Sequence, residues 1–200
     1  MPNQQPVVIV PCGGTSRRLG GVDKTRQSLA GTTVLDHLLD ALPSRSLVVC
    51  VGEERATTRA TTRSVVWCRE VPARGGPVAG IAAGLEQLAR REHFDAEICV
   101  VVGGDMPFAA AALPMLVDAL KVHPELDAVL AADPDGRPQP LLAAYRVEAL
   151  RAALPRDLGG ARLTEVVDAL TIGTVECSGQ ITLDVDTPEA LEQARHIVGA

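Results

Sequence analysis

Aromatic residues are almost absent from this chain of 200 residues, in which Phe, Trp and Tyr together make up 2%. A core must therefore be built from aliphatic side chains, and the hydrophobic content of 46% is enough to build one. The length corresponds to about one domain. The composition excludes a disordered tail, a fibrous repeat and a short disulfide scaffold.

Basic residues are also in the minority, with 19 Lys and Arg against 25 Asp and Glu and a net charge of −6. Such a chain has neither the basic stripe nor the stacking aromatics of a nucleic-acid binder, so we expect no nucleic-acid partner. The first residues lack the basic region of a signal peptide, and no apolar run is long enough to span a bilayer. We therefore expect no membrane partner and a cytoplasmic location, as a monomer or a homo-oligomer.

Closely spaced cysteine and histidine motifs are missing as well. The five cysteines, Cys12, Cys50, Cys68, Cys99 and Cys177, stand too far apart for a CxxC metal clip or redox pair. Four of them lie in apolar stretches, which is typical of small buried hydrophobic residues in a reduced compartment. None of the four histidines stands at a metal-ligand spacing from another, and no Ser-His-Asp or Cys-His arrangement is visible.

Apolar runs of strand length alternate with amphipathic helical patterns over most of the chain. Because these runs are continuous, they indicate strands covered on both faces, as in a mostly parallel sheet between helices. The predicted strands are 7–10, 47–51, 65–68, 98–102, 128–131, 141–145, 172–175 and 181–183. The predicted helices are 34–42, 78–88, 113–120, 161–170 and one that begins at 186–189. We expect a single three-layer, Rossmann-like α/β domain over residues 1–200.

The segment 11–24 follows the first predicted strand directly and contains two pairs of glycines, at 13–14 and 20–21. Glycines let backbone N–H groups approach an anion closely, and the basic side chains of the segment can neutralise a polyphosphate. Open parallel sheets bind ligands at the carboxyl ends of their strands, where this loop lies. Neither the Walker pattern nor GxGxxG fits the spacing. Taken alone, the loop is equally well explained as a solvated surface turn.

Carboxylates stand at two further places. Asp105 ends the most apolar predicted strand, where it could bind a hard cation such as Mg²⁺ or cap the next helix. Asp184 and Asp186 stand at alternate positions of an extended segment, on one side of it. Asp186 or Thr187 could also cap the last helix, because Pro and Glu follow directly.

A second glycine-rich segment, GGPVAG at 75–80, follows the third predicted strand and Glu70. Pro77 suits the first turn of a helix, and the small residues at 79 and 80 allow a flat ring to lie against the backbone. Tight packing of a helix start on the sheet explains the same small residues. The segment therefore gains a functional interpretation only from the other motifs.

In their order along the chain, these motifs resemble those of the molybdenum cofactor guanylyltransferases, which are small nucleotidyltransferases of the nucleotide-diphospho-sugar transferase type. The loop GGTSRRLGGVDK resembles the family's triphosphate loop, Glu70 with GGPVAG resembles its acidic residue and GPLAG segment, and GDMP resembles its (C/G)DxP segment. Two departures stand out. The chain has Pro11-Cys12 where the family has Leu-Ala, and DVDTPE, as in cytidylyltransferase relatives, where guanylyltransferases have NxNTPE.

The resemblance implies a transfer of GMP from GTP to molybdopterin or a similar phosphorylated acceptor, with Mg²⁺ as cofactor and pyrophosphate as product. It implies catalytic roles for Arg18, Lys24 and Asp105, and Mg²⁺ ligation by Asp105 together with Asp186 or Asp184. The nucleotide would contact Pro11, Cys12, Gly13, Gly14, Lys24, Glu70, Gly76, Pro77 and Asp105. With so few aromatic residues, we expect the base to lie against backbone, small residues and Glu70 rather than on a ring.

Three alternatives remain open from the sequence. The first is a molybdopterin cytidylyltransferase that uses CTP, because DVDTPE resembles that branch. The second is a nucleotidyltransferase for another small phosphorylated molecule. The third is a nucleotide-binding accessory protein without catalysis. The unusual Pro11-Cys12 and DxD favour it, whereas the presence of Lys24, Asp105 and Asp186 together disfavours it, because a binder needs no second carboxylate.

Overall fold

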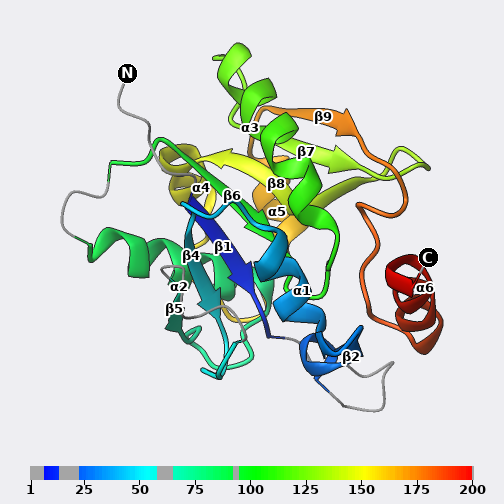
Figure 1. Cartoon of the computed structure of the whole chain (residues 1–200). Helices are drawn as coiled ribbons and strands as arrows, with labels where there is room; N and C mark the ends of the chain where they lie inside the picture. Colours follow the sequence, from blue (N-terminus) through cyan, green and yellow to red (C-terminus); the bar gives the residue numbers. More distant parts are fainter. Residues whose placement is uncertain (1–6, 14–22, 58–64, 92–94, 200) are drawn as a thin grey trace.

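A seven-stranded sheet forms the centre of the computed structural model, which describes residues 7–13, 23–57, 65–91 and 95–199. The strands are β1 (Val7–Pro11), β4 (Leu47–Val51), β5 (Val65–Cys68), β6 (Ile98–Val102), β7 (Ala128–Ala132), β8 (Pro138–Arg146) and β9 (Ile172–Glu176). They lie in the order β5-β4-β1-β6-β8-β7-β9 (Figure 1). Only β8 runs against its neighbours in this sheet, so the predicted, mostly parallel arrangement is confirmed.

Helices cover both faces of the sheet. They are α1 (Val34–Ala41), α2 (Pro77–Ala89), α3 (Leu113–Val122), α4 (Val147–Ala153), α5 (Leu163–Asp168) and α6 (Pro188–Gly199). Two short 3₁₀ helices, η2 (Lys24–Arg26) and η3 (Ala109–Ala112), and a small hairpin of β2 (Ser28–Leu29) and β3 (Thr32–Thr33) complete the described elements. No helix within the described ranges is long and apolar enough to cross a membrane.

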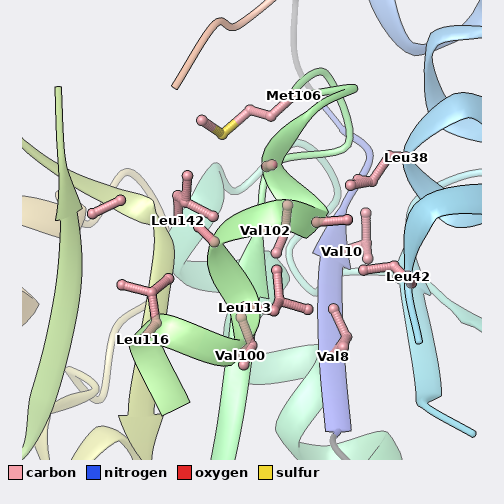
Figure 2. Packing of buried hydrophobic residues seen from close by; sticks show 14 of the residues in the cluster. Val8, Val10, Leu38, Leu42, Val100, Val102, Met106, Leu113, Leu116 and Leu142 are labelled. Carbon is pink, nitrogen blue, oxygen red and sulfur yellow. The ribbon is translucent and has the colours of Figure 1, made fainter. Parts of the chain in front are cut away.

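Each face of the sheet has its own aliphatic core, because successive side chains of a strand point to opposite faces. Val8 and Val10 of β1 pack with α1 and α3, and Figure 2 shows them near Leu38 and Leu113 of those helices. Ile9 belongs to the opposite core, with residues of α2, α4 and α5. The three layers predicted from continuous apolar runs are therefore present.

One predicted strand, 181–183, is wrong. These residues lie in turns, and the amides of Ile181 and Thr182 both donate to the Ser178 carbonyl, at 3.0 and 3.2 Å. Local bonds thus occupy donors that a sheet would use. Ile181 and Leu183 still pack against buried clusters, so the apolar pattern reported burial and not a strand.

The boundaries differ from the prediction around β8 and α5. The strand β8 begins at Pro138 instead of 141, and the helix α5 covers 163–168 instead of 161–170. The helix α4 was not predicted at all. Arg146 is both the last residue of β8 and the N-cap of α4, so no turn residue separates the two elements in the sequence.

Gly84 allows α2 to lie close against β1. A Cβ atom at this position would stand 2.5 Å from Cγ2 of Ile9, nearer than side chains pack. We expect Gly84→Ala to lower the free energy of unfolding by about 1–3 kcal/mol, because the added methyl group overpacks the interface. The intrinsic helix propensity of Ala acts in the opposite direction, by about 1 kcal/mol. Urea unfolding measures the net change.

The matched control for Gly84→Ala is the same substitution in an Ile9→Ala background. There the clashing branch is absent, and Gly84→Ala should be neutral or stabilising. Equal destabilisation in both backgrounds would show that the contact with Ile9 is not the cause.

Candidate active site

The carboxyl ends of β5, β4, β1 and β6 meet at one edge of the sheet, because the four strands are parallel neighbours. From β1 the chain builds the sheet outward through β4 and β5, and then returns to the other side of β1 as β6. Open α/β sheets bind ligands at such a reversal of strand order. The loops that follow β1 and β6 therefore border the expected binding crevice.

Backbone hydrogen bonds hold these loops together beyond the strand ends. The amide of Cys12 donates to the Val51 carbonyl at 2.8 Å, and the amide of Gly104 donates to the Pro11 carbonyl at 3.0 Å. A Cβ atom on Gly104 would lie 3.1 Å from that carbonyl oxygen and 3.2 Å from the Cys12 sulfur. Glycine at 104 thus allows the loop after β6 to approach the glycine loop after β1.

Lys24 and Asp105 form an ion pair at this edge of the sheet. The pair joins the turn that follows the glycine loop to the loop that follows β6, and the two side chains are 22% and 12% exposed. Asp105 does not cap the following helix, because η3 has Phe108 at its N-cap and no side-chain cap. The capping alternative for Asp105 is therefore wrong, and its carboxylate faces the crevice residue Lys24.

The segment with Asp184 and Asp186 lies beside Asp105. The amide of Val185 donates to the Asp105 carbonyl at 2.9 Å, and the Val185 side chain is fully buried in the cluster under α6. Its neighbours on either side are more accessible, Asp184 being exposed and Asp186 half-buried. Thr187 caps α6 by accepting from the Ala190 amide at 3.2 Å.

The charges of the three carboxylates act on one another. Although Asp184 is exposed, partial desolvation of its carboxylate by neighbouring groups, followed by the negative charges of Asp186 and Asp105, raises its pKa above the ordinary value, and Lys24 opposes this rise. The three carboxylates therefore share one region of the edge. Within the ranges that the structure describes, no three His, Cys, Asp or Glu side chains converge closely enough to hold a metal ion by themselves.

A network of side chains that the sequence did not reveal fixes the turn around Lys24. Asp23 caps η2 by accepting from the Thr25 amide at 3.0 Å, and it also accepts from the Thr25 hydroxyl at 2.6 Å. Arg55, from the loop after β4, donates to Asp23 at 2.9 Å and to the Thr25 hydroxyl. Partial burial raises the pKa of Asp23, but the bond from Thr25 and the charge of Arg55 outweigh it and lower that pKa below its ordinary value.

Glu70 lies against the start of the glycine loop. A Cβ atom on Gly13 would stand 3.5 Å from Oε1 of Glu70, which accepts from the Arg74 amide at 3.1 Å. Gly76 is the N-cap of α2 with φ of +88°, a conformation that favours glycine, and Pro77 occupies the first helical turn. The structure thus brings Glu70, Gly13 and the start of α2 to one edge.

The small residues of GGPVAG also have a packing role. A Cβ atom on Gly75 would lie 2.7 Å from that of Ala79, and one on Gly80 would lie 3.6 Å from that of Pro11. The packing explanation for this segment is therefore confirmed, and the close packing of α2 sets its first turn beside the loop.

Cys12 packs rather than reacts. Its sulfur donates to the Val10 carbonyl at 3.3 Å, and contact with Cys50 together with complete burial raises the pKa of Cys12 well above its ordinary value. All five cysteines are free, and four are buried. Two predicted site residues, Gly14 and Arg18, lie outside the described residues.

The comparison with known protein families covers the residues described above. The family model of the MobA-like NTP transferase domain matches residues 8–172, which include the glycine loop, Glu70 and Asp105. The chain belongs to the MobA-like NTP transferase family. It is therefore a nucleotidyltransferase, as its motifs predict.

Individual relatives agree with this family. The chain is 34% identical to a molybdenum cofactor guanylyltransferase of Bradyrhizobium over 147 residues, which cover 71% of this chain and 68% of the relative. Among solved structures, it is similar to the molybdopterin-guanine dinucleotide biosynthesis protein A of Archaeoglobus fulgidus, with 24% identity, a TM-score of 0.71, and coverage of 96% of this chain and 98% of that chain.

A third similar structure contains manganese. A Mycobacterium tuberculosis H37Rv protein solved in complex with manganese is similar to this chain, with 21% identity, a TM-score of 0.66, and coverage of 96% of this chain and 99% of that chain. At this identity the likeness shows a common fold. The predicted nucleotide-diphospho-sugar transferase-like architecture is thereby confirmed.

Proposed function

We propose that this protein transfers GMP from GTP to molybdopterin, with Mg²⁺ as metal and pyrophosphate as product. The observation that carries the proposal is the Lys24–Asp105 pair, which lies where the strand order reverses between β1 and β6. The relative from Bradyrhizobium is named for the same transfer, and this name supports the choice of guanylyl group and acceptor.

The donor set at the site fits Mg²⁺. Asp105 and Asp186 supply carboxylate oxygens, and Asp184 is the alternative second ligand; oxygen is the ligand that this hard cation prefers. The thiol of Cys12, whose sulfur lies near Gly104, stays protonated because its pKa is raised. Two carboxylates leave ligand positions for water and phosphate oxygens, which Mg²⁺ usually retains. When bound, the ion would neutralise charge on the triphosphate and polarise its α-phosphoryl group.

The side chains then bind and orient the nucleotide. The backbone N–H groups of the glycine loop and the Lys24 ammonium would bind the phosphates, and Arg18, which lies outside the described residues, would bind the β- and γ-phosphates. An oxygen of the acceptor phosphate attacks the α-phosphorus in line, the bond from the α-phosphorus to the bridging oxygen breaks, and pyrophosphate leaves with that oxygen. This chemistry asks mainly for positioning and charge neutralisation, so no covalent nucleophile is needed.

The base is proposed to lie beside Glu70 and the first turn of α2. Every described aromatic ring is already engaged: Tyr145 is fully buried, Phe108 meets the His37 ring edge-on, and the Arg55 guanidinium lies over Trp67. Backbone and small residues are therefore the surface against which the nucleotide base is proposed to lie. A carboxylate can accept from both N–H groups of the guanine edge, whereas cytosine offers one amino group, so Glu70 favours GTP.

The decisive experiment measures pyrophosphate release with each of the four nucleoside triphosphates, with and without molybdopterin. We expect release only in the presence of the acceptor, and faster with GTP than with CTP by more than about tenfold, because a site built to hydrogen-bond one substrate rejects another that leaves its polar groups unpaired. Glu70→Gln should reduce this preference. The matched control is Glu86→Gln, on an exposed position of α2.

Each other outcome selects an alternative. Preference for CTP would place the chain in the cytidylyl branch, and release with another phosphorylated acceptor would change the acceptor. Tight binding of Mg²⁺-GTP without release under any condition would favour an accessory protein.

A further inference from the structure

Arg55 clamps the turn that presents Lys24. Its Nη1 donates to Oδ2 of Asp23 at 2.9 Å and its Nη2 donates to the Thr25 hydroxyl, so the two ends of one guanidinium contact the residues on either side of Lys24. The Thr25 hydroxyl in turn donates to Oδ1 of Asp23, so Thr25 and Asp23 are also bonded to each other. Three side chains thus form a closed ring of hydrogen bonds around the base of Lys24.

The side chain of Arg55 is itself held against the sheet, by Trp67 of β5. Its guanidinium carbon lies 5.5 Å from the centre of the Trp67 ring on β5, and only 11% of its side chain is exposed. A guanidinium confined in this way loses less freedom than a surface one when it donates hydrogen bonds. Arg26 provides a contrast, because it also reaches Asp23, at 3.2 Å, but its side chain is 46% exposed.

We propose that Arg55 is a positioning residue for the transfer reaction, which acts by fixing the Lys24 ammonium toward the phosphates of the nucleotide. Lys24 sits on a turn of three residues and directs its side chain to Asp105, in the loop after β6. A long lysine side chain on an unsupported turn would sample many positions. The contacts of Arg55 with Asp23 and Thr25 fix the backbone from which that side chain starts, so its effect reaches the nucleotide through Lys24.

This inference rests on the proposed function, because it requires a nucleotide at Lys24. The test is a double-mutant cycle on the affinity for Mg²⁺-GTP, measured by titration calorimetry with the full chain. Arg55→Met should weaken binding by about tenfold in the wild-type background, within the range of coupling between contacting residues. In a Lys24→Met background it should weaken binding by less than about twofold, because the side chain it positions is gone.

Two further variants make the result specific. Arg55→Lys keeps the charge beside Asp23 but cannot span both contacts, so it should lose about threefold in affinity. Arg26→Met removes the exposed arginine from the same carboxylate and should change affinity by less than about twofold, as is usual for an exposed ion pair. Thermal unfolding of each variant confirms that the compared proteins are folded.

An equal loss in both backgrounds would show that Arg55 acts independently of Lys24, either on the nucleotide directly or through the general structure of the loop, and would overturn the inference. Unchanged affinity in Arg55→Met would also overturn it. Both results leave the proposed function standing, because wild-type protein still binds Mg²⁺-GTP. If wild-type protein binds no nucleotide, the proposed function fails and this inference fails with it.

Discussion

Asp105→Asn is expected to reduce Mg²⁺-dependent pyrophosphate release by about three orders of magnitude, the scale on which loss of one preorganised electrostatic group acts. The change keeps the size of the side chain but removes its negative charge. Asparagine offers one neutral oxygen to the metal instead of a carboxylate, and it also releases Lys24 from its ion pair. Steady-state release with GTP and molybdopterin measures the effect.

The fold should survive this substitution. The loop around Asp105 is held by backbone bonds, from Gly103 to Leu141, from Gly104 to Pro11 and from Val185 to Asp105, and none of them uses the carboxylate. Because Asp105 is buried and Lys24 is partly exposed, the loss of their ion pair should cost about 1–3 kcal/mol of stability, between the values for surface and buried pairs. Thermal unfolding should therefore show a cooperative transition at a lower temperature than that of the wild-type protein.

The control is Asp118→Asn, the same chemical change at an exposed position of α3. It should leave turnover unchanged. Full activity in Asp105→Asn would remove Asp105 from the metal site, and an unfolded Asp105→Asn protein would contradict the loop structure described above.

Lys24→Met should lower kcat/KM for GTP by about two orders of magnitude, because the departing pyrophosphate loses a fixed positive charge. Its signature differs from that of Asp105→Asn. The Mg²⁺ concentration for half-maximal activity should stay near the wild-type value in Lys24→Met and rise in Asp105→Asn, since only the second change removes a metal ligand. A Mg²⁺ titration at saturating GTP separates the two.

The chain provides a matched control, because its only other lysine is Lys121, in the last turn of α3. Lys121→Met should leave kcat/KM unchanged. A Lys24→Met protein as active as the wild type would exclude the ammonium from the phosphate site.

The sequence predicted those parts of the site that depend on strand ends. A continuous run such as 98–102 indicates a strand buried on both faces, and the residue that ends it, Asp105, must then lie at the ligand-binding edge. The glycine loop lies at the same edge by the same reasoning, whereas the role predicted for Lys24 came from the resemblance to the family. No distance was needed for either prediction, because the parallel sheet itself brings the two loops together.

The features of the candidate site that the sequence did not predict depend on contacts between side chains of different loops. Arg55 stands in a stretch with no motif, and its importance arises from Asp23 and Trp67, which only the folded chain brings near it. The mistaken strand at 181–183 has a related cause. Its apolar residues are buried because a turn folds them inward, and a pattern of hydropathy reports burial without saying which backbone conformation achieves it.

The last helix helps to hold the segment with Asp184 and Asp186 beside Asp105, because it packs on the first part of the chain. Leu191 and Ala194 of α6 share a buried cluster with Leu29 of β2, and Arg195 donates twice to the Ser28 carbonyl, at 3.3 and 3.2 Å. Figure 1 shows α6 beside this hairpin. The segment 184–186 leads directly into the docked helix.

The contact of Arg195 with Ser28 spans 167 residues of sequence. During synthesis the glycine loop, Lys24 and Asp105 all leave the ribosome well before α6 does. A growing chain can therefore form the β1 and β6 edge with Lys24 and Asp105 early, but the segment 184–186 is put in place beside Asp105 only when α6 docks. The position of Asp184 and Asp186 beside Asp105 thus depends on the docking of α6, and a chain that has not yet made α6 would lack this arrangement.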